Sequence, residues 1–294
     1  MPIPRAAAIH DLSGFGRCSL TIVIPVLSAM GVQCCPLPTA YLSTHTGGFT
    51  GNTFLDLTDQ MAPAAAHWRR EGVTFDAIYT GFMGSLEQIS LTADFIRAFR
   101  RPGCLVVVDP VMGDHGRPYR TYTAEMCRAM GELAALADVI TPNATEAALL
   151  LGAEYADLQL DRPEECRLWA RELSLEGRRS VVLTGVSPAE GRVGAACFDR
   201  AADRSELVDA PLAAGELHGT GDLFASVLTG SLVRGQSLTE AAALAADFTA
   251  RCAAHTLAQN LPRREGVEFE PLLGRLTSRP PEGGQVNCHG RSHN

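Results

Sequence analysis

Residues 217–226 read Leu217-His218-Gly219-Thr220-Gly221-Asp222-Leu223-Phe224-Ala225-Ser226, in which two glycines flank a threonine and an acid precedes an apolar run with helical spacing. The pattern predicts a loop that turns into a helix. Glycines let backbone N–H groups approach a ligand without interference from a Cβ atom. The N-terminus of a helix adds free N–H donors and favours an anion such as phosphate.

Asp222 is the unusual member of this segment, because a carboxylate beside an anion hole repels the anion. It makes chemical sense as a base that takes a proton from a hydroxyl group, which then attacks phosphorus. The alternative is an ordinary helix start in which Asp222 satisfies the first turn. Short glycine-rich motifs have many false positives, so this segment alone leaves both interpretations open.

The composition is typical of a globular protein, since 46% of the 294 residues are hydrophobic and 20% are charged. This length fits one large α/β domain or two smaller ones. The formal net charge of −8 argues against a nucleic-acid partner, which would need a basic face. An acidic protein can still bind a nucleotide when a divalent metal ion supplies positive charge.

The sequence predicts neither a secretory signal nor a membrane span. The residues before His10 are too few and too polar for a signal peptide. The apolar run 20–32 contains Pro25 and is too short to cross a bilayer, so we expect a buried helix there. The nine cysteines show no CxxC spacing, which indicates reduced thiols in a cytoplasmic protein.

Strand and helix signals alternate without a break over residues 6–257, which favours one domain built on a parallel sheet. We expect strands at 6–10, 32–42, 75–80, 104–108, 139–140 and 180–183, and a hairpin at 193–198 and 206–209. We expect helices at 19–30, 54–70, 86–101, 123–137, 141–151, 163–176, 223–233 and 238–257. Residues 1–276 would form the domain, and residues 277–294, which lack apolar periodicity, would be a disordered tail.

Four of the predicted loops carry acids or glycines and would face one edge of a parallel sheet. They lie at Asp11, at Gly81, at Asp109 to Asp114 and at Gly219 to Asp222. Two acids directly after a buried strand are costly without a cation, and a magnesium ion that arrives with a nucleotide would supply one.

Simpler interpretations stay open for single residues. Asp11 could be a turn residue, and Glu146 could be a first-turn acid that complements the helix dipole. The polar loop 43–51 could be solvated surface, and a lone His45 is more often structural than catalytic.

Phosphoryl transfer needs what this sheet edge offers, namely an anion cradle, carboxylates for Mg²⁺ and an acid that deprotonates the acceptor. The sequence has no GxxxxGK[ST] motif, so a Walker-type kinase is disfavoured. Gly14-Phe15-Gly16 lacks the third glycine of GxGxxG, which disfavours a Rossmann dehydrogenase.

Three motifs together resemble the ribokinase-like superfamily: Asp109-Pro110-Val111-Met112-Gly113-Asp114, Thr141-Pro142-Asn143-Ala144-Thr145-Glu146 and Gly219-Thr220-Gly221-Asp222. Two further loops are similar to the substrate-side loops of its pyridoxal/pyridoxamine kinases: Ser43-Thr44-His45-Thr46 and Thr80-Gly81-Phe82-Met83-Gly84-Ser85. The resemblance covers residues 6 to 260. It implies an α/β fold of the ribokinase-like type, a three-layer sandwich with helices on both faces of a mostly parallel central sheet.

By this resemblance the protein would use ATP to phosphorylate the 5′-hydroxymethyl group of pyridoxal, pyridoxamine or pyridoxine in vitamin B6 salvage. The resemblance implies a catalytic group, with Asp222 as the base and an anion hole of Gly219, Thr220 and Gly221. The nucleotide group would be Asp109, Asn143, Thr184 and Thr220, and the magnesium ligands, direct or through water, would be Asp114 and Glu146. The substrate group would be Asp11, Ser43, His45, Thr46 and Phe82. A monovalent cation such as K⁺ beside Asp109, Thr141 and Glu146, and a homodimer, are implied in the same way.

Two departures from the family pattern leave the preferred vitamer open: Asp11 stands where many members have serine, and Phe82 where many have tyrosine. An acid at residue 11 could favour a charged amine or a protonated pyridine, and hence weakly pyridoxamine. The rival enzyme is a hydroxymethylpyrimidine kinase of thiamine biosynthesis, although many of those carry cysteine where this chain has Asp222. A sugar kinase is less favoured because the sequence shows no lid, and a B6-binding protein without turnover would not need Asp222.

Overall fold

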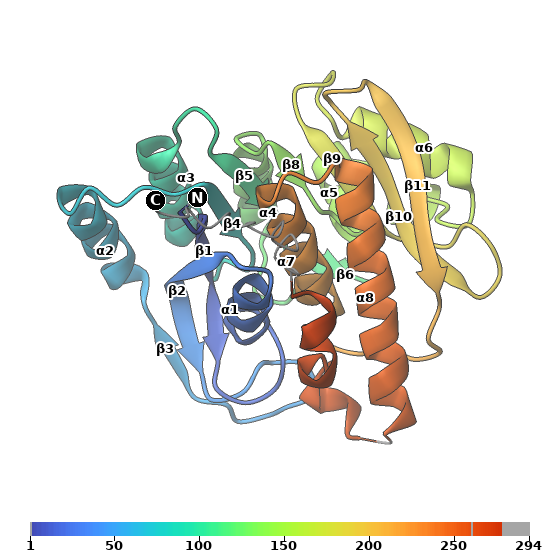
Figure 1. Ribbon diagram of the computed structural model, residues 1–294, viewed down its shortest axis with the longest axis horizontal. Helices are drawn as coiled ribbons and strands as arrows, with labels where there is room; N and C mark the ends of the chain where they lie inside the picture. The colour runs from blue at the N-terminus through green and yellow to red at the C-terminus, as the bar shows by residue number, and fades with distance from the viewer. Residues whose placement is uncertain (1, 260, 278–294) are drawn as a thin grey trace, which may run out of the picture.

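The computed structural model describes residues 2–259 and 261–277, which build a nine-stranded sheet with helices on both faces (Figure 1). The strand order is β11-β10-β9-β8-β5-β4-β1-β2-β3. The strands are β1 (Arg5–Ser13), β2 (Gln33–Leu42), β3 (Phe54–Asp56), β4 (Ala77–Thr80), β5 (Leu105–Val108), β8 (Val139–Ile140), β9 (Ser180–Val186), β10 (Arg192–Asp199) and β11 (Arg204–Pro211). A separate short hairpin joins β6 (Gly113–Asp114) to β7 (Arg117–Pro118).

Six adjacent strands, from β9 to β2, are parallel, and the sheet ends in antiparallel strands. β3 pairs antiparallel with β2 at one end, and β10 and β11 each reverse direction at the other. Because two reversals restore the original direction, β11 ends at the same sheet edge as the parallel strands. The four predicted loops therefore do share one edge.

Each face of the sheet has its own apolar core, which gives three layers and confirms the predicted ribokinase-like sandwich. One face packs on α1 (Leu20–Ala29), α7 (Thr220–Val233) and α8 (Leu238–Ala258). The other packs on α2 (Thr58–Arg70), α3 (Leu86–Phe99), α4 (Ala124–Ala134), α5 (Ala144–Leu151) and α6 (Pro163–Glu172). Short 3₁₀ turns lie at Tyr155–Asp157, Arg263–Glu265 and Glu270–Arg275.

Two local predictions were wrong, and one hairpin was not predicted. Residues 54–56 were expected in a helix but form β3, because they pair with the edge of β2, and the helix starts only at Thr58. The loop after Asp109 contains the β6–β7 hairpin, which no pattern announced. Pro142 was expected inside the first turn of α5 but precedes the N-cap, because Asn143 and Glu146 form a capping box.

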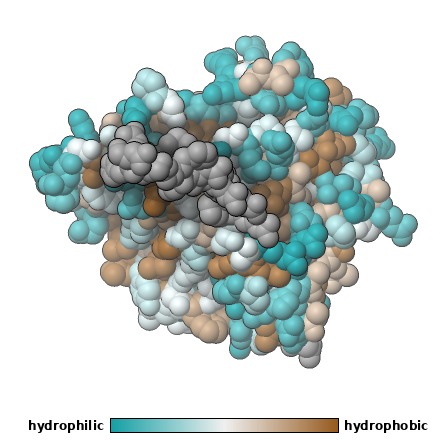
Figure 2. All heavy atoms as spheres, in the orientation of Figure 1, coloured by the Kyte–Doolittle hydropathy of each residue, from teal (hydrophilic) through white to brown (hydrophobic). Residues whose placement is uncertain are grey.

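Further findings concern the cysteines, the apolar helices and the predicted tail. The eight cysteines among the described residues are all free thiols. Within that part, no helix combines the length and apolarity that a bilayer crossing requires. Figure 2 shows one face of the molecule, where hydrophilic residues are interspersed with hydrophobic ones. The predicted tail lies outside the described residues, except for Thr277.

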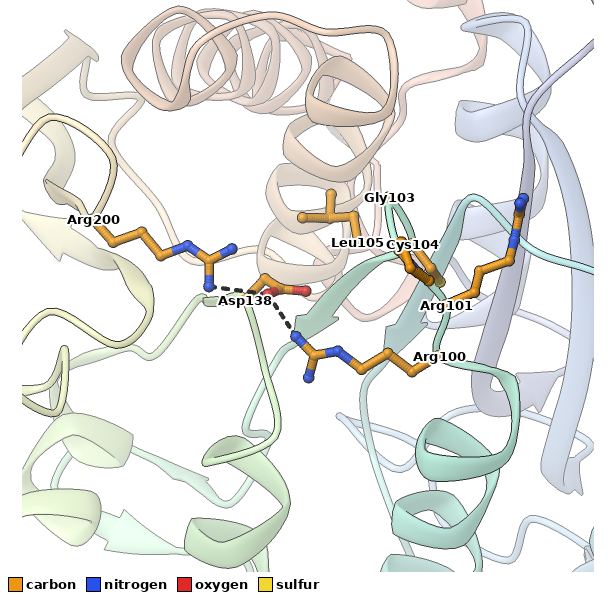
Figure 3. Close-up of a pocket in the computed structure, with 8 residues that line it drawn as sticks. Arg100, Arg101, Gly103, Cys104, Leu105, Asp138 and Arg200 are labelled. Carbon is orange, nitrogen blue, oxygen red and sulfur yellow. Dashed lines mark hydrogen bonds and ion pairs between the residues drawn. The ribbon is translucent and has the colours of Figure 1, made fainter.

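Asp138 joins three segments at the sheet edge opposite the loops discussed above (Figure 3). Its Oδ1 lies 2.7 Å from Arg100 Nη2 and 3.0 Å from Arg200 Nη1, and its Oδ2 accepts the backbone N–H of Val106 at 2.9 Å. A cavity of about 510 Å³ opens here. Its arginines already have partners, since Arg101 pairs with Asp76, so the cluster holds the sheet together.

We expect Asp138→Ala to lower the free energy of unfolding by roughly 3 kcal/mol, because two guanidinium groups and a buried N–H would lose their partner. Asp76→Ala is the matched control, since the Asp76–Arg101 pair is half exposed and should contribute less than about 1 kcal/mol. Urea unfolding of both variants measures the difference. Equal losses would contradict the assigned role of Asp138.

Candidate active site

The start of α7 forms an anion cradle at the carboxyl edge of the sheet. Gly219, its N-cap, has a φ of 82°, and a Cβ atom there would lie 2.4 Å from the carbonyl oxygen of Arg17, so only glycine fits. The described hydrogen bonds use none of the backbone N–H groups of residues 219–222. A Cβ at Gly221 would meet no atom within 4 Å, which leaves open space beside these donors.

The carboxylate of Asp222 lies beside this cradle and contacts the loop before α1. The backbone N–H of Ser19 donates to its Oδ2 at 2.9 Å. Burial raises the pKa of Asp222 to about 6, the hydrogen bond from Ser19 acts against this rise, and the charge of Asp11 adds to it. A carboxylate with this pKa is ionised at neutral pH and can accept a proton.

Two further carboxylates are buried near the ends of β5 and β8. Asp109 Oδ1 accepts the Thr141 hydroxyl at 2.8 Å, and Glu146 accepts the backbone N–H groups of Met112 and Asn143. Burial raises the pKa of Asp109 to about 7, and the charge of Asp222 adds to that rise. Burial also raises the pKa of Glu146, and Asp109 contributes through its charge.

The buried acids at this edge fit a cation. Among the described residues, Asp109, Glu146 and Asp222 form no ion pair with an arginine or histidine. Asp114, by contrast, is half exposed, and its Oδ1 accepts the neighbouring N–H of His115. The described part of the chain holds no group of three or more His, Cys, Asp or Glu side chains that could form a complete metal site. A magnesium ion here would need phosphate oxygens as further ligands.

Two of the four predicted nucleotide-side residues, Asn143 and Thr184, lie together at the ends of β8 and β9. The Asn143 side chain caps α5 and donates to the carbonyl oxygen of Gly113 at 2.9 Å, so its amide is engaged in the fold. The Thr184 backbone N–H donates to the carbonyl oxygen of Pro142 at 2.9 Å. Their roles toward a nucleotide stay predictions.

The loop 43–51 folds against the anion cradle and against the segment that follows α8. Gly47 N–H donates to Nδ1 of His45, so Nε2 carries the proton and donates to the carbonyl oxygen of Arg264 at 2.7 Å. The ring of His45 lies 5.2 Å from that of His218, which precedes the cradle. His45 is therefore buried and structural in its contacts, and burial lowers its pKa.

The other predicted substrate residues differ in exposure and contacts. Ser43 closes its loop by accepting the N–H of Thr53, and Thr46 is exposed. Phe82 is half-buried, 6.0 Å from the ring of Tyr122. Asp11 is buried at a bulge in β1, where it accepts hydroxyl groups from Ser19 at 2.6 Å and Ser13 at 3.3 Å.

The sequence did not single out two parts of the site. Ser19 touches both Asp11 and Asp222. The segment after α8 crosses the site loops, since Glu265 accepts the N–H of Arg17 at 3.0 Å and Val267 donates its N–H to His218 at 3.0 Å. Apart from Ser19–Asp11, which are 8 positions apart, these contacts join residues about 50 to 250 positions apart, so no local pattern could announce them.

The fold and the site together define a small-molecule kinase of the ribokinase-like class: one sheet edge combines N–H groups at a helix start, unpaired within the described part of the chain, a half-buried carboxylate beside them and further buried acids. The chain belongs to the phosphomethylpyrimidine kinase family, whose model matches residues 24–264. The predicted family resemblance is thereby confirmed.

Three known proteins show how far the similarity extends. A pyridoxine/pyridoxal/pyridoxamine kinase of Bordetella avium is 33% identical over 246 residues, which cover 77% of this chain and 77% of that protein. A Bacteroides thetaiotaomicron protein described as a phosphomethylpyrimidine kinase, crystallised with pyridoxal, is 43% identical with a TM-score of 0.88, covering 96% of this chain and 98% of that one. Pyridoxal kinase from Lactobacillus plantarum is 33% identical with a TM-score of 0.85, covering 94% and 97%.

We expect kcat/KM to fall as the pH drops below about 6, because Asp222, if it acts as the predicted base, must be ionised to accept a proton and its pKa is raised to about 6. The rate should lose about tenfold per pH unit on this acid limb. Initial rates of ADP formation from pH 4.5 to 8 measure it. The midpoint of this acid limb should be the same for every acceptor alcohol tested. A midpoint that changed with the acceptor would show that a group on the acceptor titrates, and would contradict the assignment to Asp222.

Proposed function

We propose that the protein transfers the γ-phosphoryl group of ATP to the 5′-hydroxymethyl group of a B6 vitamer. The observation that carries this proposal is the carboxylate of Asp222, which lies half-buried beside backbone N–H donors that have no hydrogen-bond partner among the described residues. Support also comes from the relatives, because a chain 43% identical binds pyridoxal in its crystal and chains 33% identical are named for the vitamers. The thiamine alternative, a hydroxymethylpyrimidine kinase, has the weaker support.

In the proposed reaction Asp222 accepts the proton of the substrate hydroxyl as its oxygen attacks the γ-phosphorus. The bond from that phosphorus to the bridging oxygen breaks, and ADP leaves. The N–H groups of residues 219–222 stabilise the charge on the transferred group, since they are already fixed in direction. A carboxylate and an anion cradle can share this space because one acts on the hydroxyl proton and the other on the phosphoryl oxygens.

Magnesium would accompany ATP, and Asp114 and Glu146 would hold it directly or through water. The ion would supply positive charge to the phosphates and to the buried acids. We extend the proposal to a monovalent cation such as K⁺ beside Asp109, Thr141 and Glu146, where two buried carboxylates repel each other.

The remaining substrate contacts are proposed on the same basis. ATP would lie over the ends of β8 and β9, along Asn143, Thr184, Asp109 and Thr220. The vitamer would lie between Asp11, Thr46 and Phe82, with Ser43 and His45 shaping the loop. The eight free thiols support a reducing, cytoplasmic setting. Residues 1–276 would act as one kinase domain, which the single continuous sheet supports.

We expect Asp222→Asn to lower kcat by at least about 10²-fold while leaving ligand binding intact, because the amide cannot accept the proton. The measurement is ADP formation with pyridoxal, pyridoxamine, pyridoxine and the hydroxymethylpyrimidine alcohol, with ATP binding measured by calorimetry. Wild-type turnover by the variant would remove Asp222 as the base. Turnover restricted to the pyrimidine alcohol would select the rival function, and binding without turnover by the native protein would select a carrier.

A homodimer is also proposed, and the sheet edge at β3 supports it. Among the residues that the structure describes, none pairs with the outer side of this strand, and Phe54 and Leu55 are 56% and 57% exposed. We expect the double substitution Phe54→Ser and Leu55→Ser to convert a dimer into a monomer in light scattering. Leu168→Ser is the control, because that leucine is 66% exposed on α6, on another part of the surface. A mass unchanged by the double substitution would place the interface elsewhere.

A further inference from the structure

Ser19 has a backbone conformation that serine rarely adopts. Its φ is 50° and its ψ is −128°, a region in which side-chain-bearing residues are disfavoured. Such a conformation persists only where the surroundings impose it, and such residues are frequent at functional sites. Ser19 is 3% exposed and immediately precedes α1, so the conformation is held inside the structure.

The Ser19 side chain does not cap the helix that it precedes. A serine at an N-cap usually accepts an N–H from the first helical turn, but no such hydrogen bond forms here. The hydroxyl donates instead to Oδ1 of Asp11 at 2.6 Å. The helix therefore lacks a normal stabilising contact, and the residue makes a link to β1 in its place.

The same conformation points the backbone N–H of Ser19 at Asp222. The N–H donates to Oδ2 at 2.9 Å, across 203 positions of sequence. A hydrogen bond to one carboxylate oxygen restricts rotation of the group and does not occupy the other oxygen, Oδ1, which could receive a proton. Thus one residue contacts Asp222 through its backbone and Asp11 through its side chain.

We propose that Ser19 is a positioning residue for the base: its hydroxyl, anchored on Asp11, holds the backbone so that the N–H orients the carboxylate of Asp222. This inference rests on the proposed function, because it assumes that Asp222 takes the substrate proton. Ser19 acts through Asp222 and is not itself a catalytic residue.

The groups that act on Asp222 come from three directions. Asp11 on β1 raises the pKa of Asp222 by its charge, whereas the Ser19 N–H and the Cys18 thiol, both before α1, lower it. The third direction is the sheet itself, where Asp109 follows β5 and Tyr79 lies in β4. Burial raises the pKa values of both groups, and the charge of Asp222 adds to each rise. Of these contacts, only the N–H hydrogen bond depends on the backbone of Ser19.

Ser19→Ala and Ser19→Gly test the proposal as a pair. Alanine disfavours the observed conformation as serine does, but it lacks the hydroxyl that anchors the backbone there. The backbone should therefore relax and turn the N–H away from Asp222. We expect kcat to fall roughly 10-fold to 100-fold, with little change in the KM for ATP. The acid limb of the pH profile should move to higher pH, because the N–H no longer favours the ionised carboxylate.

Glycine adopts the observed conformation without strain, so Ser19→Gly should retain the N–H and recover most of the kcat that alanine loses. Its acid limb should stay at the native pH. Ser13→Ala is the matched control, because it removes the other hydroxyl on Asp11 without touching Asp222. Its acid limb should also stay in place.

The decisive measurement is the double variant Ser19→Ala with Asp222→Asn. If Ser19 acts through the base, alanine should cost nothing further in kcat once Asp222 is asparagine. The inference would be overturned if alanine lowered kcat equally with Asp222 present and with Asp222→Asn. It would also be overturned if Ser19→Ala alone kept the native kcat and the native pH of the acid limb. If Ser19→Ala does not fold, as judged by circular dichroism, a folded Ser19→Gly with a tenfold lower kcat would overturn it equally.

The outcomes separate this inference from the proposed function. If Asp222→Asn alone turned over at the native rate, the base assignment would fail, and with it the function that this inference assumes. If Asp222→Asn lost activity while Ser19→Ala kept both rate and limb, the proposed function would stand and only the role of Ser19 would be refuted.

Discussion

Repulsion among buried carboxylates is the constraint on which this site depends. Asp11, Asp109, Glu146 and Asp222 come from four segments of the chain, and each has a pKa raised mainly by burial. Hydroxyl and N–H donors offset part of that cost, but no cationic side chain in the described structure pairs with them. A cation would offset this repulsion, so the metal–nucleotide complex proposed above would be favoured by the same charges that the fold must tolerate.

The topology explains how acids so far apart in sequence meet at one edge. The parallel strands deliver Asp11 and Asp109 directly, and the β10–β11 hairpin returns the chain so that α7 starts beside them. The close approach of Gly219 to the carbonyl oxygen of Arg17 then locks the cradle against the loop that carries Ser19. The segment after α8 also contacts these loops, because Val267 donates its N–H to the carbonyl oxygen of His218 and the carbonyl oxygen of Arg264 accepts from His45.

Much of this arrangement could be predicted from the sequence, because short-range rules decide it. Continuous β-branched runs such as 104–108 predicted buried parallel strands, and the acids that follow them were correctly placed at one edge. The predictions failed where pairing with a neighbouring strand outweighed the local pattern, as at 54–56, which pair with the end of β2. They also could not find Ser19, since a serine before an apolar run is typical of a helix start and its conformation comes from partners elsewhere in the chain.

The contacts of Asp11 change how its charge should be understood. From the sequence, an acid at this position suggested direct recognition of a charged amine or a protonated pyridine. In the structure both of its oxygens already accept serine hydroxyls, and one of those serines reaches the base. Moreover, burial raises the pKa of Asp11, so full negative charge there is not favoured without these donors. Asp11 is therefore better placed to anchor the proposed base than to select a vitamer by charge, and under the proposed function selectivity would fall to other residues of the substrate group, such as Phe82 and the loop 43–51.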